Sequence, residues 1–147
     1  MSAPDSSLRS AFLSATYGKN DERFSLGKLA GPWLSWAKQG QSWAVLTAWN
    51  PAGKQSARGE NLRRGEQLRR ELLELGLSFL DGVNGEGAWA EPGCIVLGLS
   101  LREAASLGAR HGQAAVLWGV GRRVALTWCA PMCAPIRLER RWVALKR

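Results

Sequence analysis

Five polar side chains stand at or near the ends of apolar segments of the sequence, where the elements of a fold meet. They are Thr47, Asn50, Asn61, Glu91 and Gln113. Such positions can converge at one edge of a sheet, where they would offer amide and hydroxyl donors and acceptors and one carboxylate. This set suits the binding of a polar small molecule, or of a base edge, through hydrogen bonds. Trp89, two residues before Glu91, would form a wall of the same cleft.

The same residues also have structural interpretations, and these remain open. An Asn before a Pro, as in Asn50-Pro51, commonly shapes a turn. Asn61 can bond to the preceding loop, and Gln113 can satisfy exposed strand backbone. The sequence therefore predicts either a ligand-binding cleft or a scaffold at these positions.

Catalysis has a weaker basis in the sequence. Glu91 is the one residue of the set that could act as a general acid or base, and catalysis usually needs a second ionisable group beside it. His111, the sole histidine, is predicted at a helix C-terminus, where a cation meets the negative end of the helix dipole. Whether the protein is an enzyme stays open.

Basic residues gather near the end of the chain, where residues 112–147 hold seven Lys or Arg and one Glu. The residues that could contact phosphates, with Trp142 among them to stack on a base, are Arg137, Arg140, Arg141, Lys146 and Arg147. Nucleic-acid binding by this segment is the alternative function. The other interpretation is a solvated tail that keeps the protein soluble.

Composition predicts one packed domain. The 147 residues are 46% hydrophobic and 22% charged, with a net charge of +8. No apolar run reaches the roughly 18 residues that cross a bilayer, and Met1 to Leu8 lacks the features of an export signal. We therefore expect a cytoplasmic protein with no membrane contact and no cofactor. The three cysteines predict free thiols, with neither a disulfide framework nor a metal site.

Hydrophobic periodicity and turn residues give the expected elements. The predicted strands are 23–29, 43–49 (apolar on both faces and central), 94–99, 114–118 and 123–128 (a hairpin), with a possible edge strand around 136–139. The predicted helices are 32–39, 58–75 and 100–111, the last opened by a capping box of Ser100 and Glu103. Leu8, Phe12 and Leu13 could form a short helical patch, and 77–87 reads as an exposed, mobile loop.

These elements predict an α+β fold, in which a mixed sheet of about four or five strands packs with about three helices. We expect a loosely ordered N-terminal segment (1–22), a single α+β domain (23–130) and a basic C-terminal segment (131–147). Oligomeric state does not follow from these residues.

Four blocks of the sequence resemble a known family. They are Thr47-Ala-Trp-Asn50-Pro51, Asn61 with Leu68, Trp89-Ala-Glu91 and Gly112-Gln113-Ala114-Ala115. Over about residues 23–128 the chain resembles the uncharacterised bacterial family called domain of unknown function 3293. That family commonly has a serine soon after the Asn-Pro and another two residues beyond the Glu, where this chain has Gly53 and Gly93. The resemblance implies no activity, and these two glycines exclude a role for hydroxyl groups there.

Overall fold

A computed structural model describes residues 6–38, 40–129 and 136–145 of the chain. One eight-stranded sheet runs through it, in the order β1-β2-β8-β7-β6-β3-β5-β4. Its strands are β1 (Thr16–Lys19), β2 (Glu22–Gly27), β3 (Ser42–Leu46), β4 (Phe79–Asn84), β5 (Glu91–Leu97), β6 (Ala115–Val120), β7 (Arg123–Trp128) and β8 (Arg137–Leu145). The helices are α1 (Ser6–Ser14), α2 (Arg58–Glu74) and α3 (Leu101–Arg110), with short 3₁₀ turns η1 (Pro51–Gly53) and η2 (Gly87–Trp89).

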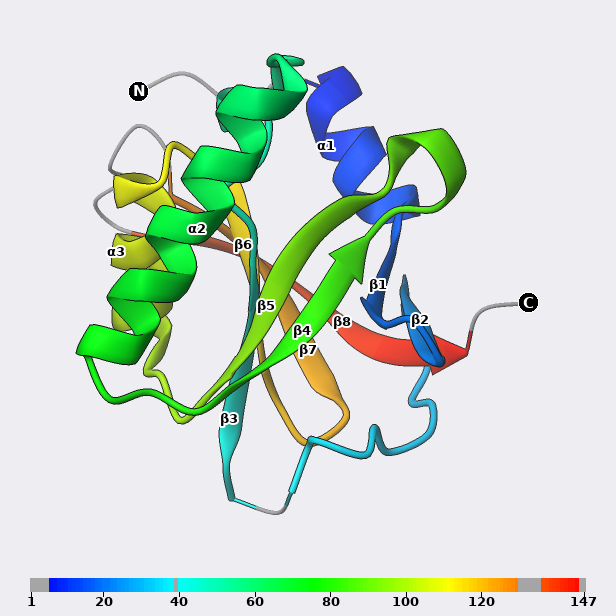
Figure 1. Ribbon diagram of the computed structural model, residues 1–147. Coiled ribbons are helices and arrows are strands. Elements are labelled where there is room, and N and C mark those ends of the chain that lie inside the picture. The colour runs from blue at the N-terminus through cyan, green and yellow to red at the C-terminus, as the bar shows by residue number, and fades with distance from the viewer. Residues whose placement is uncertain (1–5, 39, 130–135, 146–147) are drawn as a thin grey trace.

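The sheet curls until its two edge strands lie next to each other (Figure 1). Gly85, just after β4, donates its N–H to the carbonyl of Thr16 in β1 at 2.7 Å. The Arg23 guanidinium bridges the same gap by donating to the carbonyls of Val83 and Gly85 at 2.6 and 2.8 Å. These bonds hold the eight strands as a nearly closed sheet, with its concave side filled by one hydrophobic core.

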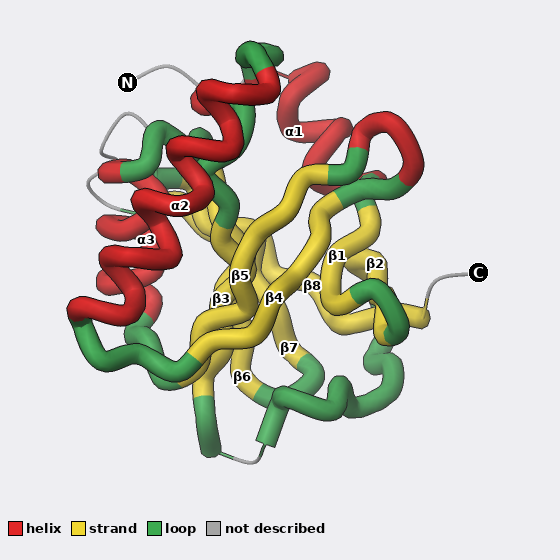
Figure 2. The backbone as a smooth tube through the Cα atoms, viewed as in Figure 1, coloured by secondary structure: helices red, strands yellow, loops and turns green. Residues whose placement is uncertain are grey.

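Two cores lie on the two faces of this sheet. The concave face encloses an aromatic cluster in which Trp43 meets Phe24 and Trp36 edge to face, at ring-centroid distances of 5.6 and 6.2 Å. The outer face is covered by α2 and α3 through Leu68, Leu72 and Leu107, among other residues (Figure 2). Strand β3 contributes to both cores. The prediction of a strand that is apolar on both faces is confirmed, and β3 lies inside the sheet between β6 and β5, third from one end of the strand order.

The predicted mixed sheet of four or five strands is wrong in size and in direction. All seven strand pairs are antiparallel, and the sheet has eight strands. The α+β class and the presence of three α-helices among the described residues are confirmed. The strands that escaped prediction, β1 and β4, contain glycines and polar residues that look locally like turns, although each pairs with the strand that follows it in sequence.

The predicted loop at 77–87 is instead largely strand β4, paired with β5 from Phe79 opposite Val96 to Asn84 opposite Glu91. The strand tolerates turn-forming residues because β4 is the last strand in the strand order. Only one of its two edges has to form hydrogen bonds with a neighbouring strand. Asp81 points out to an ion pair with Arg69 of α2. A Cβ at Gly82 would lie 3.2 Å from Ile95 Cγ1, closer than most Cβ contacts, so the glycine makes room for the Ile95 side chain.

The predicted helix at 32–39 is also wrong, since its described residues form a turn rather than a helix. Its apolar side chains, Leu34 and Trp36, are buried in the concave core, which requires an irregular path. The Ser35 N–H donates to the Glu22 carboxylate at 2.7 Å instead of to a helical carbonyl. Here tertiary burial overrides the local helix signal.

Both ends of the chain contribute elements. The stretch 6–19, within the segment expected to be loosely ordered, forms α1 and β1, and Leu8, Phe12 and Leu13 pack against the concave core. The expected edge strand near 136–139 is part of β8, whose residues 137–142 pair with β7 and whose residues 142–145 pair with β2. Residues 137–139 therefore pair on one side only, although β8 as a whole lies between β2 and β7 in the strand order. None of the described helices is long and apolar enough to span a membrane.

Gly119→Ala tests the packing between β6 and β3. A Cβ at Gly119 would overlap the ring of Trp43, which is fully buried and cannot move aside. We expect a loss of about 1–3 kcal/mol in the free energy of unfolding, measured by urea denaturation. Gly59→Ala, on α2 where no atom lies within 4 Å of the new methyl group, is the matched control. Equal stability of the two variants would contradict this packing.

Candidate functional site

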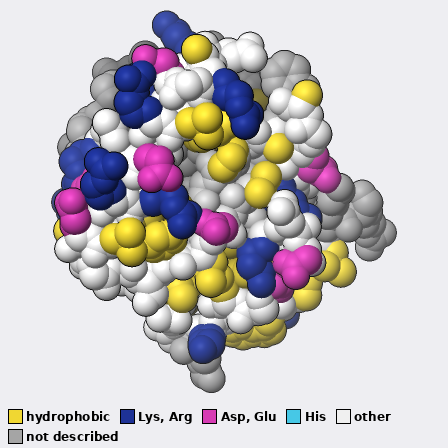
Figure 3. Space-filling model, viewed as in Figure 1, with side chains coloured by type: hydrophobic (Ala, Val, Ile, Leu, Met, Phe, Trp, Pro, Cys, Tyr) yellow, Lys and Arg dark blue, Asp and Glu magenta, His cyan; other side chains and the backbone are white. Residues whose placement is uncertain are grey.

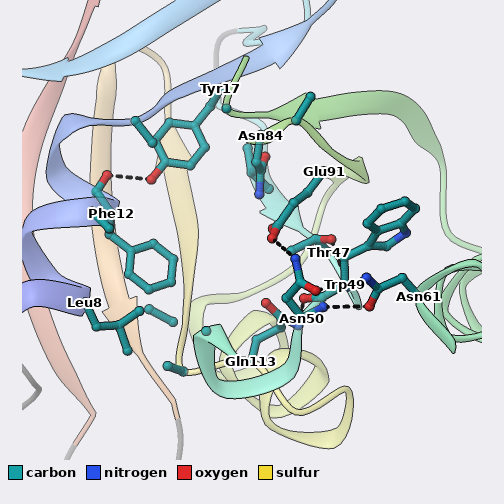
Figure 4. A pocket seen from close by; sticks show the side chains of 18 of the residues that line it. Leu8, Phe12, Tyr17, Thr47, Trp49, Asn50, Asn61, Asn84, Glu91 and Gln113 are labelled. Carbon is teal, nitrogen blue, oxygen red and sulfur yellow. Dashed lines mark hydrogen bonds between the residues drawn. The ribbon is translucent and has the colours of Figure 1, made fainter. Parts of the chain in front are cut away.

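All five polar residues predicted from the sequence line one cavity of about 580 Å³ (Figure 4). It opens where the chain leaves β3, beneath α1 and beside the start of α2. Its polar side is formed by Thr47, Asn50, Asn61, Glu91 and Gln113, together with Asn84, Ser56 and Arg58. Its apolar side is formed by Leu8, Phe12, Tyr17, Val45 and Leu117. The convergence of the polar set follows from the ends of β3, β5 and α3 meeting at one rim.

Asn50 is held in a strained conformation by its neighbours. Its φ of 48° lies in the left-handed region, which Asn tolerates better than most residues. Pro51 then begins η1, and the Ala52 N–H donates to the Gly112 carbonyl at 2.7 Å. This turn directs the Asn50 side chain into the cavity.

Asn50 and Asn61 form a reciprocal pair. The Asn50 N–H donates to Asn61 Oδ1, and Asn61 Nδ2 donates to Asn50 Oδ1, both at 2.9 Å. Asn50 Oδ1 also accepts the Ser56 N–H at 2.9 Å. Asn61 is buried in the first turn of α2, so this pair fixes the loop between β3 and α2.

Glu91 sits beside this pair with a perturbed pKa. Asn50 Nδ2 donates to Glu91 Oε2 at 2.6 Å. Burial raises the pKa of Glu91 above its ordinary range, and the bond from Asn50 opposes that rise only in part. Among the described residues, Glu91 Oε1 has no hydrogen-bond partner. One carboxylate oxygen is therefore available to a molecule in the cavity.

Thr47 and Gln113 bond mainly to backbone. The Thr47 hydroxyl donates to the Pro92 carbonyl at 2.9 Å and accepts the Trp49 N–H at 3.1 Å. Gln113 Nε2 donates to the Trp49 carbonyl at 3.1 Å. These bonds attach the end of β3 to β5 and to the segment after α3, which positions the rim.

Several lining residues were not singled out by the sequence. Asn84, directly opposite Glu91 in the β4–β5 pair, has a buried Oδ1 without a hydrogen-bond partner in the described structure. It was hidden in the stretch expected to be a loop. Phe12 and Tyr17 come from α1 and β1, and the Tyr17 hydroxyl donates to the Phe12 carbonyl at 2.5 Å. The helical spacing of Leu8 and Phe12 was the available signal for this wall.

The remaining predicted residues lie elsewhere. The side chain of Trp89 falls outside the part of the chain that the structure describes, as do Lys146 and Arg147. Arg137, Arg140 and Arg141 belong to β8, and none of them lines this cavity. His111 caps α3 as expected, and its Nε2 lies 2.7 Å from the Glu71 carboxylate of α2.

The described residues include neither a reactive cysteine nor a cluster of metal ligands. Cys94 and Cys129 are buried and unbridged, and burial raises the pKa of the Cys94 thiol to about 11. At neutral pH this thiol is protonated and a poor nucleophile. Cys133 falls outside the described residues. No cluster of three or more His, Cys, Asp or Glu side chains in the described part of the chain is placed to hold a metal ion.

Asn61→Ala tests the scaffold within the site. Removing this amide leaves the Asn50 N–H without its acceptor in a partly buried place. We expect a loss of about 1–3 kcal/mol in the free energy of unfolding, measured by urea denaturation. Gln67→Ala, on an exposed part of α2, is the control and should change stability little. A near-neutral Asn61→Ala would show that the pair contributes nothing to the fold.

Glu91→Gln tests the raised pKa. Because the folded protein keeps the Glu91 proton to a higher pH than the unfolded chain, the wild type loses stability as pH rises between the two pKa values. The glutamine cannot ionise and is spared this loss. We expect the variant to gain on the wild type in unfolding free energy as pH rises above about 4, the pKa of a glutamate in an unfolded chain. A difference that does not change with pH would contradict the raised pKa.

Comparison with known proteins gives one match. Residues 46–116 match the model of a family described as protein of unknown function (DUF3293). No curated protein and no solved structure matches the chain significantly. The matched segment runs from the end of β3 to β6 and contains all five predicted polar residues of the cavity. The resemblance seen in the sequence is thereby confirmed over residues 46–116, where the chain is similar to the DUF3293 family.

Proposed function

We propose that this protein binds a small molecule in the cavity between α1, β3 and α2. The observation that carries the proposal is the gathering of polar groups from four separate segments on one side of a cavity whose other side is apolar. Its volume of about 580 Å³ falls within the range of small-molecule sites, which are mostly apolar with a few placed polar groups.

The polar groups left without partners define the ligand chemistry. Glu91 Oε1 and Asn84 Oδ1 are both acceptors, they belong to residues paired across β4 and β5, and neither bonds to another described residue. Two acceptors, one of them on a carboxylate, favour a ligand group that carries N–H donors, such as an amine or a guanidine. A cation there would also lower the pKa of Glu91 and keep it ionised.

The apolar wall defines the rest of the ligand. Phe12, Leu8 and Leu117 offer aromatic and aliphatic surface, against which an apolar portion of the ligand would lose contact with water. Arg58, exposed at the start of α2, adds one positive charge at the rim. We therefore propose a ligand with a nitrogen-containing head and an apolar body.

The scaffold and binding interpretations then apply to different residues. Asn61, Thr47 and Gln113 direct their hydrogen bonds to neighbouring backbone and to Asn50, so we assign them to shaping the site. Glu91, Asn84 and Asn50 carry the contacts to the ligand. Trp89 remains a proposed wall.

Acid or base catalysis by Glu91 is the second candidate, favoured by the raised pKa of its carboxyl group. An elevated pKa in a cleft is typical of catalytic carboxyls. However, Glu91 is the one carboxylate among the described lining residues, and no His or Cys lines the cavity beside it. Binding without chemistry needs fewer groups, and for that reason we favour it.

Ligand binding is tested with small probes of the proposed chemistry. Benzylamine and benzamidine, each a nitrogen-containing cation on an aromatic ring, are titrated into the protein while the melting temperature and the NMR signals of residues 47–61 are followed. We expect a rise in melting temperature and local signal shifts in the wild type. In Glu91→Gln, which removes the charge, we expect affinity to fall at least tenfold, about 1.4 kcal/mol.

Glu66→Gln, on the exposed side of α2, is the matched control because it removes an equal charge away from the cavity. It should bind the probes like the wild type. Binding that is lost equally in both variants would show non-specific attraction of cations to the surface. Preference for benzoate over benzylamine would contradict the proposed ligand class.

A further inference from the structure

A second cavity, of about 710 Å³, lies over β6, β7 and β8 and is bordered by Leu101 at the start of α3. Most of its lining, including Trp118, Ala125, Arg140 and Trp142, lies on the strand face opposite to the one that carries Leu117, although Val124 and Arg141 also line it. Adjacent residues of a strand point to opposite faces, so Leu117 lines the first cavity and Trp118 lines the second. The two sites are therefore separate.

The floor of this second cavity is apolar and hollowed. Trp118, Ala125 and Arg140 stand in a row across β6, β7 and β8, because Trp118 pairs with Ala125 and Ala125 pairs with Arg140. The small side chain of Ala125 leaves space between its larger neighbours. On the other side of β8, Trp142 lies opposite Gly27 of β2, which has no side chain to fill the space.

Cations surround this floor without acidic neighbours. Lys28, Arg123, Arg140 and Arg141 line the cavity, and no Asp or Glu appears among its described lining residues. Lys28, Arg123 and Arg140 donate no hydrogen bond from their side chains to described residues. Only Arg141 is engaged, with its own neighbour's carbonyl and with Glu139 at 3.7 Å.

The two tryptophans are held with their rings at the cavity. Trp118 Nε1 donates to the Leu99 carbonyl at 2.9 Å, which fixes the indole. The Arg123 guanidinium lies 4.7 Å from the centre of the Trp142 ring. A guanidinium over an indole is pre-organised both to stack on a planar base and to meet a phosphate.

The helical side of the molecule lacks these properties. On the face shown in Figure 3, Lys and Arg side chains alternate with Asp and Glu. Arg63 and Arg64 pair with Glu60, Arg69 pairs with Asp81, and Arg110 pairs with Glu71. Most arginines of α2 are thus paired with a carboxylate, Arg58 and Arg70 excepted, whereas three of the four cations that line the second cavity have no acidic partner among the described residues.

We propose that this cavity binds a short stretch of single-stranded nucleic acid. Aromatic rings beside unpaired cations are the arrangement by which proteins hold single strands, with bases on the rings and phosphates on the cations. On the outer face of β8, Leu138, Arg140 and Trp142 follow one another about 7 Å apart along the strand. An extended chain of alternating bases and phosphates can follow this row. The site differs from a basic tail because Lys28, Arg123 and Trp118 come from other strands and the residue after β2.

The test measures fluorescence anisotropy of a labelled oligouridylate of about ten nucleotides with the full chain. We expect log affinity to fall with log salt concentration with a slope of about −2, as roughly three neutralised phosphates predict for a single strand. Arg123→Gln combined with Arg140→Gln should weaken binding at least tenfold and bring the slope to about −1. Both side chains are exposed, so the fold is retained.

Arg63→Gln combined with Arg70→Gln is the matched control, since it removes two exposed charges from α2. It should bind like the wild type. Trp142→Leu should lower affinity about tenfold through lost stacking, and Trp142→Phe should restore most of it. Circular dichroism of both variants checks that the sheet is intact.

Five results would overturn the proposal. The first is an absence of oligouridylate binding at about 50 mM salt. The second is equal weakening of binding by the two double Arg variants. The third is that inorganic polyphosphate binds as tightly as the oligonucleotide and that Trp142→Leu has no effect on binding. The fourth is loss of binding in Lys146→Gln with Arg147→Gln while Arg123→Gln with Arg140→Gln still binds, which would place the contact at the end of the chain. Selective binding to anionic phospholipid vesicles would equally exclude a nucleic-acid site.

Discussion

The amide pair of Asn50 and Asn61 joins the loop after β3 to the start of α2 and, through the Asn50 side chain, to strand β5. It receives the backbone N–H groups of Asn50 and Ser56 and reaches the Glu91 carboxylate on β5. A buried backbone group without a partner is costly, and the chain between β3 and α2 has no ladder to supply one. The polar rim of the first cavity therefore exists because the fold needs these amides. The same bonds that stabilise the loop bring a carboxylate to the cavity surface.

Local signals in the sequence were enough for the elements whose burial is regular. Strand β3 was found because Trp43 to Ala48 is apolar on both faces, and α3 because Ser100 and Glu103 form the predicted capping box. Strand β4 was missed because Gly82 and Asn84 resemble turn residues, although its pairing with β5 decides its structure. The size of the sheet could not follow from the sequence, because β8 pairs with β2, more than a hundred residues earlier in the chain.

The site shows the same division. Thr47, Asn50, Asn61, Glu91 and Gln113 could be predicted to converge because each follows or precedes an apolar element, and the ends of neighbouring elements meet. Asn84 and Tyr17 could not, since their place beside Glu91 depends on β1 and β4 closing the sheet. For the basic residues, the sequence indicated where charge accumulates along the chain, but not that Arg123 and Lys28 would stand beside Arg140.

The attachment of α1 affects how a molecule could enter the first cavity. This helix has no fully buried residue, but Leu8, Phe12 and Leu13 pack partly against the core and the Tyr17 hydroxyl donates to the Phe12 carbonyl. A bidentate ion pair between Arg9 and the Glu139 carboxylate of β8 adds a charged contact. Ion pairs that face water weaken as dissolved salt screens their charges. Dissolved salt therefore weakens one of the contacts that hold this wall of the cavity in place, while the apolar contacts of the helix are unaffected.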